Sequence, residues 1–357
     1  MDLTQTSQEL QKIVAFEDVF NRIFKLIDAE GGLVEGGIVV QDSLALLANL
    51  VRHNRTNQDL FRETGCVRRL SQLLRPPPGG AQSFDAQHAI SMWGFLAVLR
   101  LFLVQGSPGT QLNQDVFSKH GILQQVLDLA FGRDAPVNIR AEALYTCADM
   151  IRGNSKLQVG FAQHQVESAT PAETSQNGKS VNGTRKVYVI DALLDLALSA
   201  SSVSLFDARY AACECIKAYM YRHDQIRLHF LERAIEGHKN GDVTTNALTV
   251  LVRGSEGTDP YVMWFATVLI LHLLYDDPKA KDTLMSVVEG DESSGEEVIT
   301  CVQAAAGNLV AAIQRGDDER VTVAYLMLLC GWLFESADAV NDFLNEGSIL
   351  QILIQTA

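Results

Sequence analysis

Hydrophobic residues recur along the chain in a pattern typical of helices that bury one face. Between Ser43 and Val51 the mainly apolar positions fall at offsets 0, 1, 4, 7 and 8, and Phe61 follows Val51 by ten residues. Because an α-helix has about 3.6 residues per turn, these offsets share one face. The template recurs, each time with a downstream anchor residue, at Phe95–Leu103 with Phe117, Ala143–Ile151 with Phe161, Ala212–Met220 with Phe230, Ala266–Leu274 with Leu284, and Tyr325–Leu333 with Phe343.

Six copies of one template predict a repeat architecture. Each unit is expected to hold a buried first helix, a short turn, and a second helix opened by the anchor. Gly65, Gly121 and Gly347 follow their anchors by four residues, and Arg140 and Arg209 stand 21 residues before theirs. Because solenoid units bury their apolar faces against each other, we predict an all-α, armadillo-like right-handed helical solenoid (an α-α superhelix). We expect residues 1–357 to form a single array, with the aromatic anchors in its core.

The spacing between anchors exceeds that of ordinary armadillo units. Successive anchors are 56, 44, 69, 54 and 59 residues apart, against roughly 40–47 residues in such repeats. The excess lies in polar segments rich in Gly, Ser, Pro or acidic residues, near 75–87, 165–186, 237–259 and 289–297. We expect these segments to be mobile surface insertions. Neither end of the sequence resembles a polar capping unit, so the chain is expected to be part of a longer globular head.

Composition excludes several classes of function. The 43 acidic and 29 basic residues give a formal net charge of -14, and nucleic-acid binding usually needs a basic surface. No nucleic-acid partner is therefore expected. The most apolar runs, 89–104 and 261–275, are too short to span a bilayer, and the polar N-terminus does not resemble a signal peptide. The six cysteines show no disulfide framework, so we expect a cytoplasmic protein.

No motif in the sequence predicts catalysis. The glycines of Gly31–Gly37 lack the lysine of a phosphate-binding loop. Cys213 and Cys215, with His223 and His229 downstream, could suggest zinc, but residues two apart on a helix point in nearly opposite directions. The sequence therefore predicts no cofactor, no metal and no enzymatic activity.

Several segments resemble a known family. They are Lys12–Phe20, Glu30–Gly32, Ile38–Leu44, Asn57–Phe61 and Glu63–Gly65, then Leu326–Leu333 with Asn341–Phe343, and more weakly Ile151–Asn154. These residues closely resemble the family of the general vesicular transport factor, the long coiled-coil tether that captures vesicles travelling from the endoplasmic reticulum to the Golgi. The resemblance covers nearly the whole chain except its polar insertions.

The resemblance implies a non-catalytic interaction platform and a set of partners. It implies an armadillo-like head and a homodimer in the intact protein. It also implies binding to an early-secretory Rab GTPase, to SNARE proteins and to other tethering factors. Membrane association would be peripheral and through partners, on Golgi and ER-derived transport vesicle membranes. In the family the head begins upstream of Met1 and a coiled-coil rod follows Ala357, so partners that need either part are not expected to bind this chain.

The polar residues of the segment from Asp42 to Glu63 are the candidate partner-binding surface. They lie mostly off the apolar stripe and are Asp42, Asn49, Arg52, Asn54, Asn57, Gln58 and Glu63. The alternative for Asn57 and Gln58 is that they only begin the second helix. The competing function is an armadillo adaptor or scaffold outside trafficking, such as a nuclear import receptor, a formin regulatory domain or a guanine-nucleotide exchange chaperone. Import receptors are expected to carry Asn and Trp ladders on second helices, whereas Trp93, Trp264 and Trp332 fall in or beside first-helix patterns.

Overall fold

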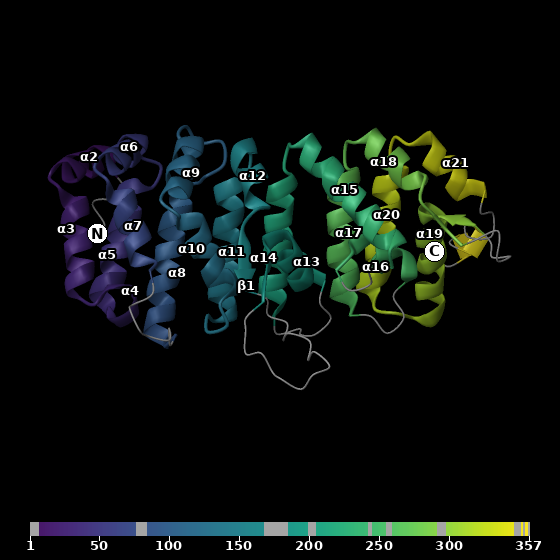
Figure 1. Ribbon diagram of the computed structural model, residues 1–357, viewed down its shortest axis with the longest axis horizontal. Coiled ribbons are helices and arrows are strands. Elements are labelled where there is room, and N and C mark those ends of the chain that lie inside the picture. Colours follow the sequence, from purple (N-terminus) through teal and green to yellow (C-terminus); the bar gives the residue numbers. More distant parts are fainter. Residues whose placement is uncertain are drawn as a thin grey trace. The chain divides into compact units, whose positions relative to one another are not determined.

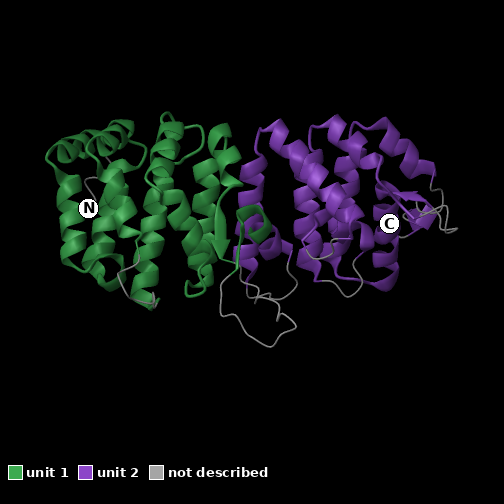
Figure 2. Cartoon of the chain, viewed as in Figure 1, with its two compact units in different colours: residues 1–192 green, residues 193–357 purple. Residues whose placement is uncertain are grey.

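The computed structural model describes residues 7–75, 84–167, 185–198, 205–241, 245–254, 259–290 and 298–345, together with 351, 352, 354 and 355. The chain divides into two compact units, Met1–Ala192 and Leu193–Ala357 (Figure 2). The single array of residues 1–357 stays a prediction.

Unit 1 is built of helices and one pair of short strands (Figure 1). Its elements are α2 (Gln8–Phe16), α3 (Val19–Ala29), α4 (Gly32–Glu35), α5 (Ile38–Val51), α6 (Arg55–Glu63), α7 (Cys66–Leu73), α8 (Ala86–Leu101), α9 (Thr110–Lys119), α10 (Ile122–Phe131), α11 (Val137–Ile151), α12 (Ser155–Phe161), β1 (Gln165–Glu167) and β2 (Lys186–Tyr188).

Unit 2 is also built of helices and one pair of short strands. Helix α13 (Val189–Leu198) contains the division between the two units, which falls after Ala192. The further elements of unit 2 are α14 (Phe206–Met220), α15 (Asp224–Lys239), α16 (Ala247–Arg253), α17 (Pro260–Leu274), α18 (Pro278–Met285), β3 (Val288–Glu289), β4 (Ile299–Thr300), α19 (Cys301–Arg315), α20 (Glu319–Leu333) and α21 (Ala337–Asn345).

The repeating unit has three helices, so the prediction of two helices per unit was wrong. A short helix carries the anchor, a second helix follows, and a long helix completes the unit, as in α6, α7 and α8. The glycines after the anchors explain the extra helix. Gly65 and Gly121 adopt φ of 75° and 77°, a left-handed conformation that ends one helix and lets another begin at once. In Figure 1 the anchor-bearing helices α6, α9 and α12 line one edge of unit 1, and α15, α18 and α21 line one edge of unit 2.

The template positions form the core. In unit 1 the long helices α5, α8 and α11 bury all of their template residues, and Leu47 and Cys147 are completely inaccessible. The anchor Phe61 packs edge-on against Phe20, with ring centroids 5.1 Å apart, and also lies 5.1 Å from the Phe102 ring. These contacts join three consecutive parts of unit 1 through aromatic rings.

The last copy of the template departs from the prediction. Tyr325, Leu329 and Trp332 of α20 are buried, but Leu326 is exposed, and the anchor Phe343 of α21 is only half-buried. In α20 the buried face therefore includes Leu328 in place of Leu326.

The two arginines noted from their spacing close the ends of preceding helices. Arg140 donates its Nε–H to the carbonyl of Ala130 at 3.0 Å, and Arg209 donates to that of Ala197 at 3.2 Å. Arg209 is 1% exposed and also pairs with Asp259 at 2.6 Å. Carbonyls at a helix C-terminus lack partners within the helix, so these guanidinium groups satisfy them.

The polar insertions are partly structured. The segment 237–259, predicted to be a loop, contains α16, whose Leu248 and Leu251 are buried because they pack as a short apolar helix. The strands were not predicted: β1 pairs antiparallel with β2, and β3 with β4. Residues 76–83, 168–184 and 291–297, which hold most of the other insertions, lie outside the described residues.

Candidate partner-binding surface

The predicted partner-binding residues divide into two groups. Asp42, Arg52 and Glu63 are exposed. The structure buries the remaining residues, which are Asn49, Asn54, Asn57 and Gln58. Buried side chains cannot reach a partner, so in the described structure the candidate surface of this segment reduces to the three charged residues.

The buried amides bind the ends of the long helices. Asn57 donates its Nδ2–H to the carbonyls of Leu50 at 2.8 Å and Gln11 at 3.1 Å. Gln58 donates from Nε2 to Val51 O at 3.0 Å and to Leu101 O at 3.2 Å. Asn54 caps the N-terminus of α6, because its side chain accepts a hydrogen bond from the backbone N–H of Asn57 at 3.2 Å. The amides therefore act inside unit 1, where they satisfy carbonyls that would otherwise be buried without partners.

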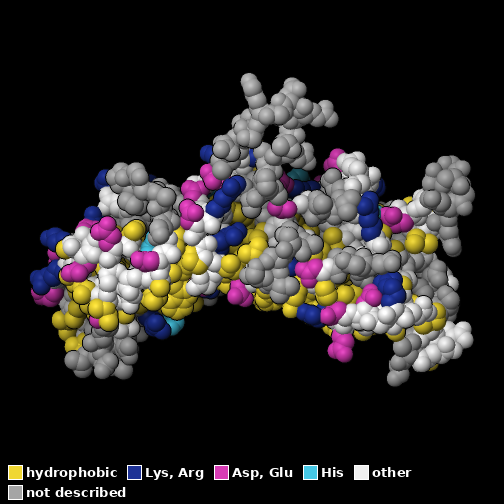
Figure 3. All heavy atoms as spheres, turned by 90° about the horizontal axis from the view of Figure 1, so that it is seen from below, with side chains coloured by type: hydrophobic (Ala, Val, Ile, Leu, Met, Phe, Trp, Pro, Cys, Tyr) yellow, Lys and Arg dark blue, Asp and Glu magenta, His cyan; other side chains and the backbone are white. Residues whose placement is uncertain are grey.

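Exposed apolar side chains also lie on α5 and α8, and the candidate residues missed them. On α5, Ile38 is 71% exposed and Val39 also reaches solvent; on α8, Ile90 is 53% and Trp93 52% exposed. The two helices pack directly against each other. We call Ile38, Val39, Ile90 and Trp93 the α5–α8 patch. Its members add to the hydrophobic side chains that unit 1 leaves at its surface, some of which are seen in Figure 3.

The sequence did contain a signal for this patch. Ile90, Trp93 and Ala97 are spaced three and four residues apart, as one helical face. They run beside the template stripe of the same helix, so α8 is apolar on more than one side. A helix of that kind is either fully buried or presents one apolar face for binding.

Charge on the neighbouring surface is held in a network. Arg100 of α8 pairs with Glu142 and Asp149 of α11, each at 2.7 Å. Burial raises the pKa of the Asp149 carboxyl, and the Arg100 guanidinium opposes that rise. The Arg100 guanidinium also lies 5.5 Å from the Tyr145 ring centroid. These charged groups pair with one another. The α5–α8 patch is mainly apolar.

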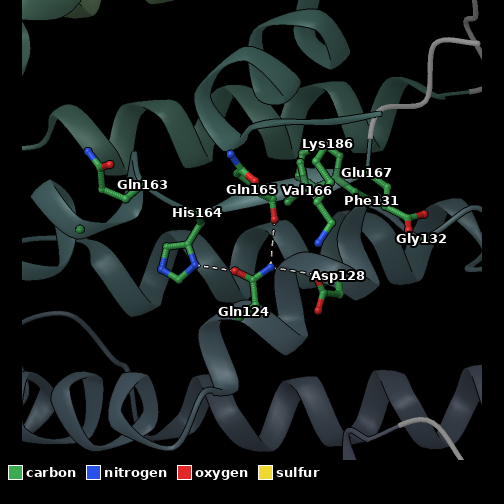
Figure 4. A pocket seen from close by; sticks show the side chains of 11 residues that line it. Gln124, Asp128, Phe131, Gly132, Gln163, His164, Gln165, Val166, Glu167 and Lys186 are labelled. Carbon is green, nitrogen blue, oxygen red and sulfur yellow. Dashed lines mark hydrogen bonds between the residues drawn. The ribbon is translucent and has the colours of Figure 1, made fainter. Parts of the chain in front are cut away.

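A cavity of about 730 Å³ opens between α10, the end of α12 and β1 (Figure 4). His164 points toward Gln124 there, and their Nδ1 and Oε1 atoms are 2.6 Å apart. Gln124 donates in turn to Asp128 Oδ1 at 2.8 Å and to the carbonyl of Gln165 at 3.1 Å. Burial lowers the pKa of His164, an effect that Asp128 partly opposes.

Hydrogen bonds among the cavity residues hold the backbone of β1 in place. A neutral His164 can donate its Nδ1–H to Gln124, which fixes the amide so that it reaches β1. No hydroxyl or thiol lies among the lining residues. The hydrogen bonds of His164 and Gln124 tie β1 to α10.

The described part of the chain contains neither a candidate metal-binding cluster nor a helix that could span a membrane. The residues searched there contain no cluster of three or more His, Cys, Asp or Glu that could hold a metal ion. Cys213 and Cys215 are both buried, burial raises the pKa of the Cys213 thiol to about 12, and His223 caps α15. None of the described helices is both long and apolar enough to cross a bilayer. The fold and its surfaces define a helical-repeat binding module.

Comparison with known proteins places this module in a family. The model of the Uso1 / p115 like vesicle tethering protein, head region, matches residues 154–357, more than half of the chain. The intracellular protein transport protein USO1 of Saccharomyces cerevisiae is 28% identical over 99% of this chain and 22% of its own length. The general vesicular transport factor p115 of Bos taurus is 27% identical over 98% of this chain and 34% of its own.

Solved structures agree with the sequence matches. A crystal structure of Uso1 superposes with a TM-score of 0.88 at 28% identity, over 99% of this chain and 53% of that one. The chain therefore belongs to the Uso1/p115-like family of vesicle tethering proteins, which is not a family of enzymes. The prediction of an all-α, armadillo-like solenoid is confirmed. The chain spans about a fifth to a third of the length of these curated relatives.

Proposed function

We propose that this chain is a non-catalytic interaction platform of a tethering factor in ER-to-Golgi transport. It binds an early-secretory Rab GTPase, SNARE proteins and other tethering factors. It stays cytoplasmic and reaches Golgi and transport-vesicle membranes through these partners, as part of a homodimer. Family membership supports a role in vesicular transport. The single observation that carries the proposal to a surface is the α5–α8 patch, a set of exposed apolar side chains that includes a tryptophan, on helices that also expose Asp42.

The chemistry of the patch is that of a protein interface. Interface cores are enriched in aromatic and aliphatic side chains, and tryptophan is among the residues that contribute most to binding. Exposed charges at the edge of such a core mainly set specificity and association rate. Asp42 is exposed on α5, Arg52 follows the last residue of α5, and Glu63 lies at the end of α6.

The test is a pulldown of GTP-loaded early-secretory Rab by this chain. Ile90→Ala combined with Trp93→Ala should weaken capture at least about tenfold, because truncating interface anchors commonly costs more than 1 kcal/mol each. Arg52→Glu with Glu63→Lys leaves the net charge unchanged and should weaken capture less. Leu112→Ala with Val159→Ala removes comparably exposed apolar side chains from α9 and α12 and is the matched control. Full capture by the Ile90/Trp93 variant would refute this site.

A further inference from the structure

A groove between α15 and α18 in unit 2 has a filled counterpart in unit 1. It encloses about 390 Å³ and is lined by Asp224, Gln225, Arg227, Leu228, Leu231, Leu273, Asp276, Asp277, Lys279, Ala280 and Thr283. Aligning the anchors Phe61 and Phe230 makes Leu231 equivalent to Arg62, and Leu228 equivalent to Asp59. Aligning Phe117 with Leu284 makes Ala280 equivalent to Asn113.

Unit 1 fills the corresponding space with its own arginine. Arg62 of α6 reaches across to α9, where it donates to the side-chain oxygen of Asn113. It also pairs with Asp59 on its own helix. The Arg62 side chain is 12% exposed, so it is packed between the two short helices. In unit 2 all three of these positions hold apolar residues, two of them shorter (Leu231 for Arg62 and Ala280 for Asn113), and the space stays open.

The open groove retains the chemistry that an arginine needs. Leu231 and Leu273 are buried at its base, whereas Leu228 is 52% exposed. Asp224 and Asp276 line the groove, and within the described residues neither carboxylate has a hydrogen bond or ion pair. The other acidic group, Asp277, accepts the amide N–H of Ala280 at 3.1 Å and lies 3.6 Å from Arg227.

The cations that line the groove do not cancel this charge. Arg227 donates to the carbonyls of Leu273 at 2.7 Å and Tyr275 at 2.9 Å, so its guanidinium is committed to the end of α17. Lys279 is the remaining cation that lines the groove, so one positive charge is opposed by the two carboxylates of Asp224 and Asp276. The groove therefore combines an apolar base with an acidic rim, which complements an aliphatic stem that ends in a positive charge.

We infer that this groove is a docking site for an arginine side chain of a protein partner. The methylene stem of the partner's arginine packs on Leu228 and Leu231 in unit 2. This is the position that corresponds to the Arg62 side chain in unit 1. The guanidinium pairs with Asp224 and Asp276, whose carboxylates can each accept two of its N–H groups. The site is separate from the α5–α8 patch and does not depend on which partner that patch binds.

The experiment is an NMR titration of the whole chain with the peptide acetyl-SLRLS-amide. The amide signals of Leu228, Ala280 and Thr283 should shift, and the same peptide with Gln in place of Arg should give much weaker shifts. Asp224→Asn with Asp276→Asn should raise Kd about 3- to 10-fold, since exposed charge pairs contribute about 0.2–1 kcal/mol each. Asn tolerates the left-handed backbone of residue 276, where φ is 55°, so the turn is preserved.

Two further variants separate docking from general attraction to an acidic protein. Glu232→Gln with Glu319→Gln removes the same charge from exposed positions of unit 2 outside the groove and should leave Kd within about twofold. Leu231→Arg supplies the unit 1 arginine from the chain itself and should abolish the peptide shifts. Equal weakening by the Glu232/Glu319 pair, or equal binding of the Gln peptide, would overturn the inference.

Discussion

The two units use different side chains to satisfy the free carbonyls at the ends of their long helices. In four of the repeats the residue three before the anchor donates hydrogen bonds to carbonyls at the end of the next long helix. In unit 1 this residue is an amide: Gln58 reaches Leu101 O at 3.2 Å, and Gln114 reaches Asp149 O at 2.9 Å. In unit 2 it is a cation: Arg227 reaches Tyr275 O at 2.9 Å.

Lys281 extends the cationic version to the following repeat. It is 4% exposed, donates to the carbonyl of Phe334, and lies 5.8 Å from the centroid of that ring. The free carbonyls of a helix C-terminus carry partial negative charge, so either donor satisfies them, but only a cation also gains from the helix dipole. Amides can accept as well as donate, and Asn113 accordingly donates to Gln58 at 3.1 Å. At these positions unit 1 therefore has a neutral chain of amides, whereas unit 2 has separate charged contacts.

The largest expected effect comes from the anchors. Phe61→Ala should destabilise unit 1 by about 3–5 kcal/mol, because it opens a cavity in a fully buried site. Phe230→Ala should cost about 0.5–1.5 kcal/mol less, since in the described residues Phe230 lacks the ring contacts that Phe61 makes with Phe20 and Phe102. Hydrogen exchange resolved to peptides of each unit measures both losses.

A matched control uses a ring that the fold leaves in solvent. Phe16→Ala removes the same atoms from a position that is 69% exposed and should change stability by less than about 0.5 kcal/mol. If Phe61→Ala kept the exchange protection of unit 1, the anchor would not hold the core together.

The donor position itself gives a smaller and more diagnostic difference. Lys281→Met should destabilise unit 2 by about 1.5–3 kcal/mol, the range for a hydrogen bond made by a charged group. Gln58→Met should destabilise unit 1 by about 1–2 kcal/mol, because two buried carbonyls lose a neutral donor. Urea denaturation followed by fluorescence, with exchange to assign the unit, measures both values.

Salt distinguishes the two kinds of donor. Raising the salt concentration should reduce the cost of Lys281→Met more than that of Gln58→Met, because screening weakens the interaction of an ammonium with the helix end. An identical salt response in the two variants would mean that the charge in unit 2 adds nothing to the hydrogen bond.

Periodicity was sufficient to predict the core but not the number of helices. Leu47, Cys147 and Ile216 are buried as the 3.6-residue repeat requires. The helix that follows the anchor helix was missed because the spacing of Gly65 and Gly121 does not by itself reveal their left-handed backbone, which starts a new helix. Helix α16 was missed because a short apolar segment between polar ones carries little periodicity.

The candidate surface shows a different limit of sequence analysis. Polarity suggested that Asn57 and Gln58 face solvent, but polar groups are buried readily where backbone carbonyls need donors. The repetition of Asn-Gln-Asp at 57–59 and 113–115, each time beside an anchor, was the available signal for an internal role. Trp93 was assigned to a helix but not to its surface, since one helix with two apolar stripes does not reveal which stripe is buried.

The smallest effects should come from the turns that follow the long helices. After α11 the left-handed residue is Gly153, with φ of 70°, whereas after α14 it is Arg222, with φ of 51°. An L-residue pays about 1–2 kcal/mol for this conformation and glycine does not. Gly153→Ala should therefore cost about 1 kcal/mol. Arg222→Gly should change stability by less than about 0.5 kcal/mol, because the relieved strain is offset by the greater freedom of glycine in the unfolded chain.

Arg222 also makes a side-chain contact that its substitution removes. Its guanidinium lies 5.2 Å from the Tyr221 ring centroid, an exposed cation–π contact of about 0.5–1 kcal/mol. Arg222→Gln retains the backbone strain but removes the cation, so it isolates the contact from the conformation. Urea midpoints at constant slope measure these changes. A neutral Gly153→Ala would show that the turn after α11 relaxes to accept a side chain, as the turn after α5 already does at His53, with φ of 52°.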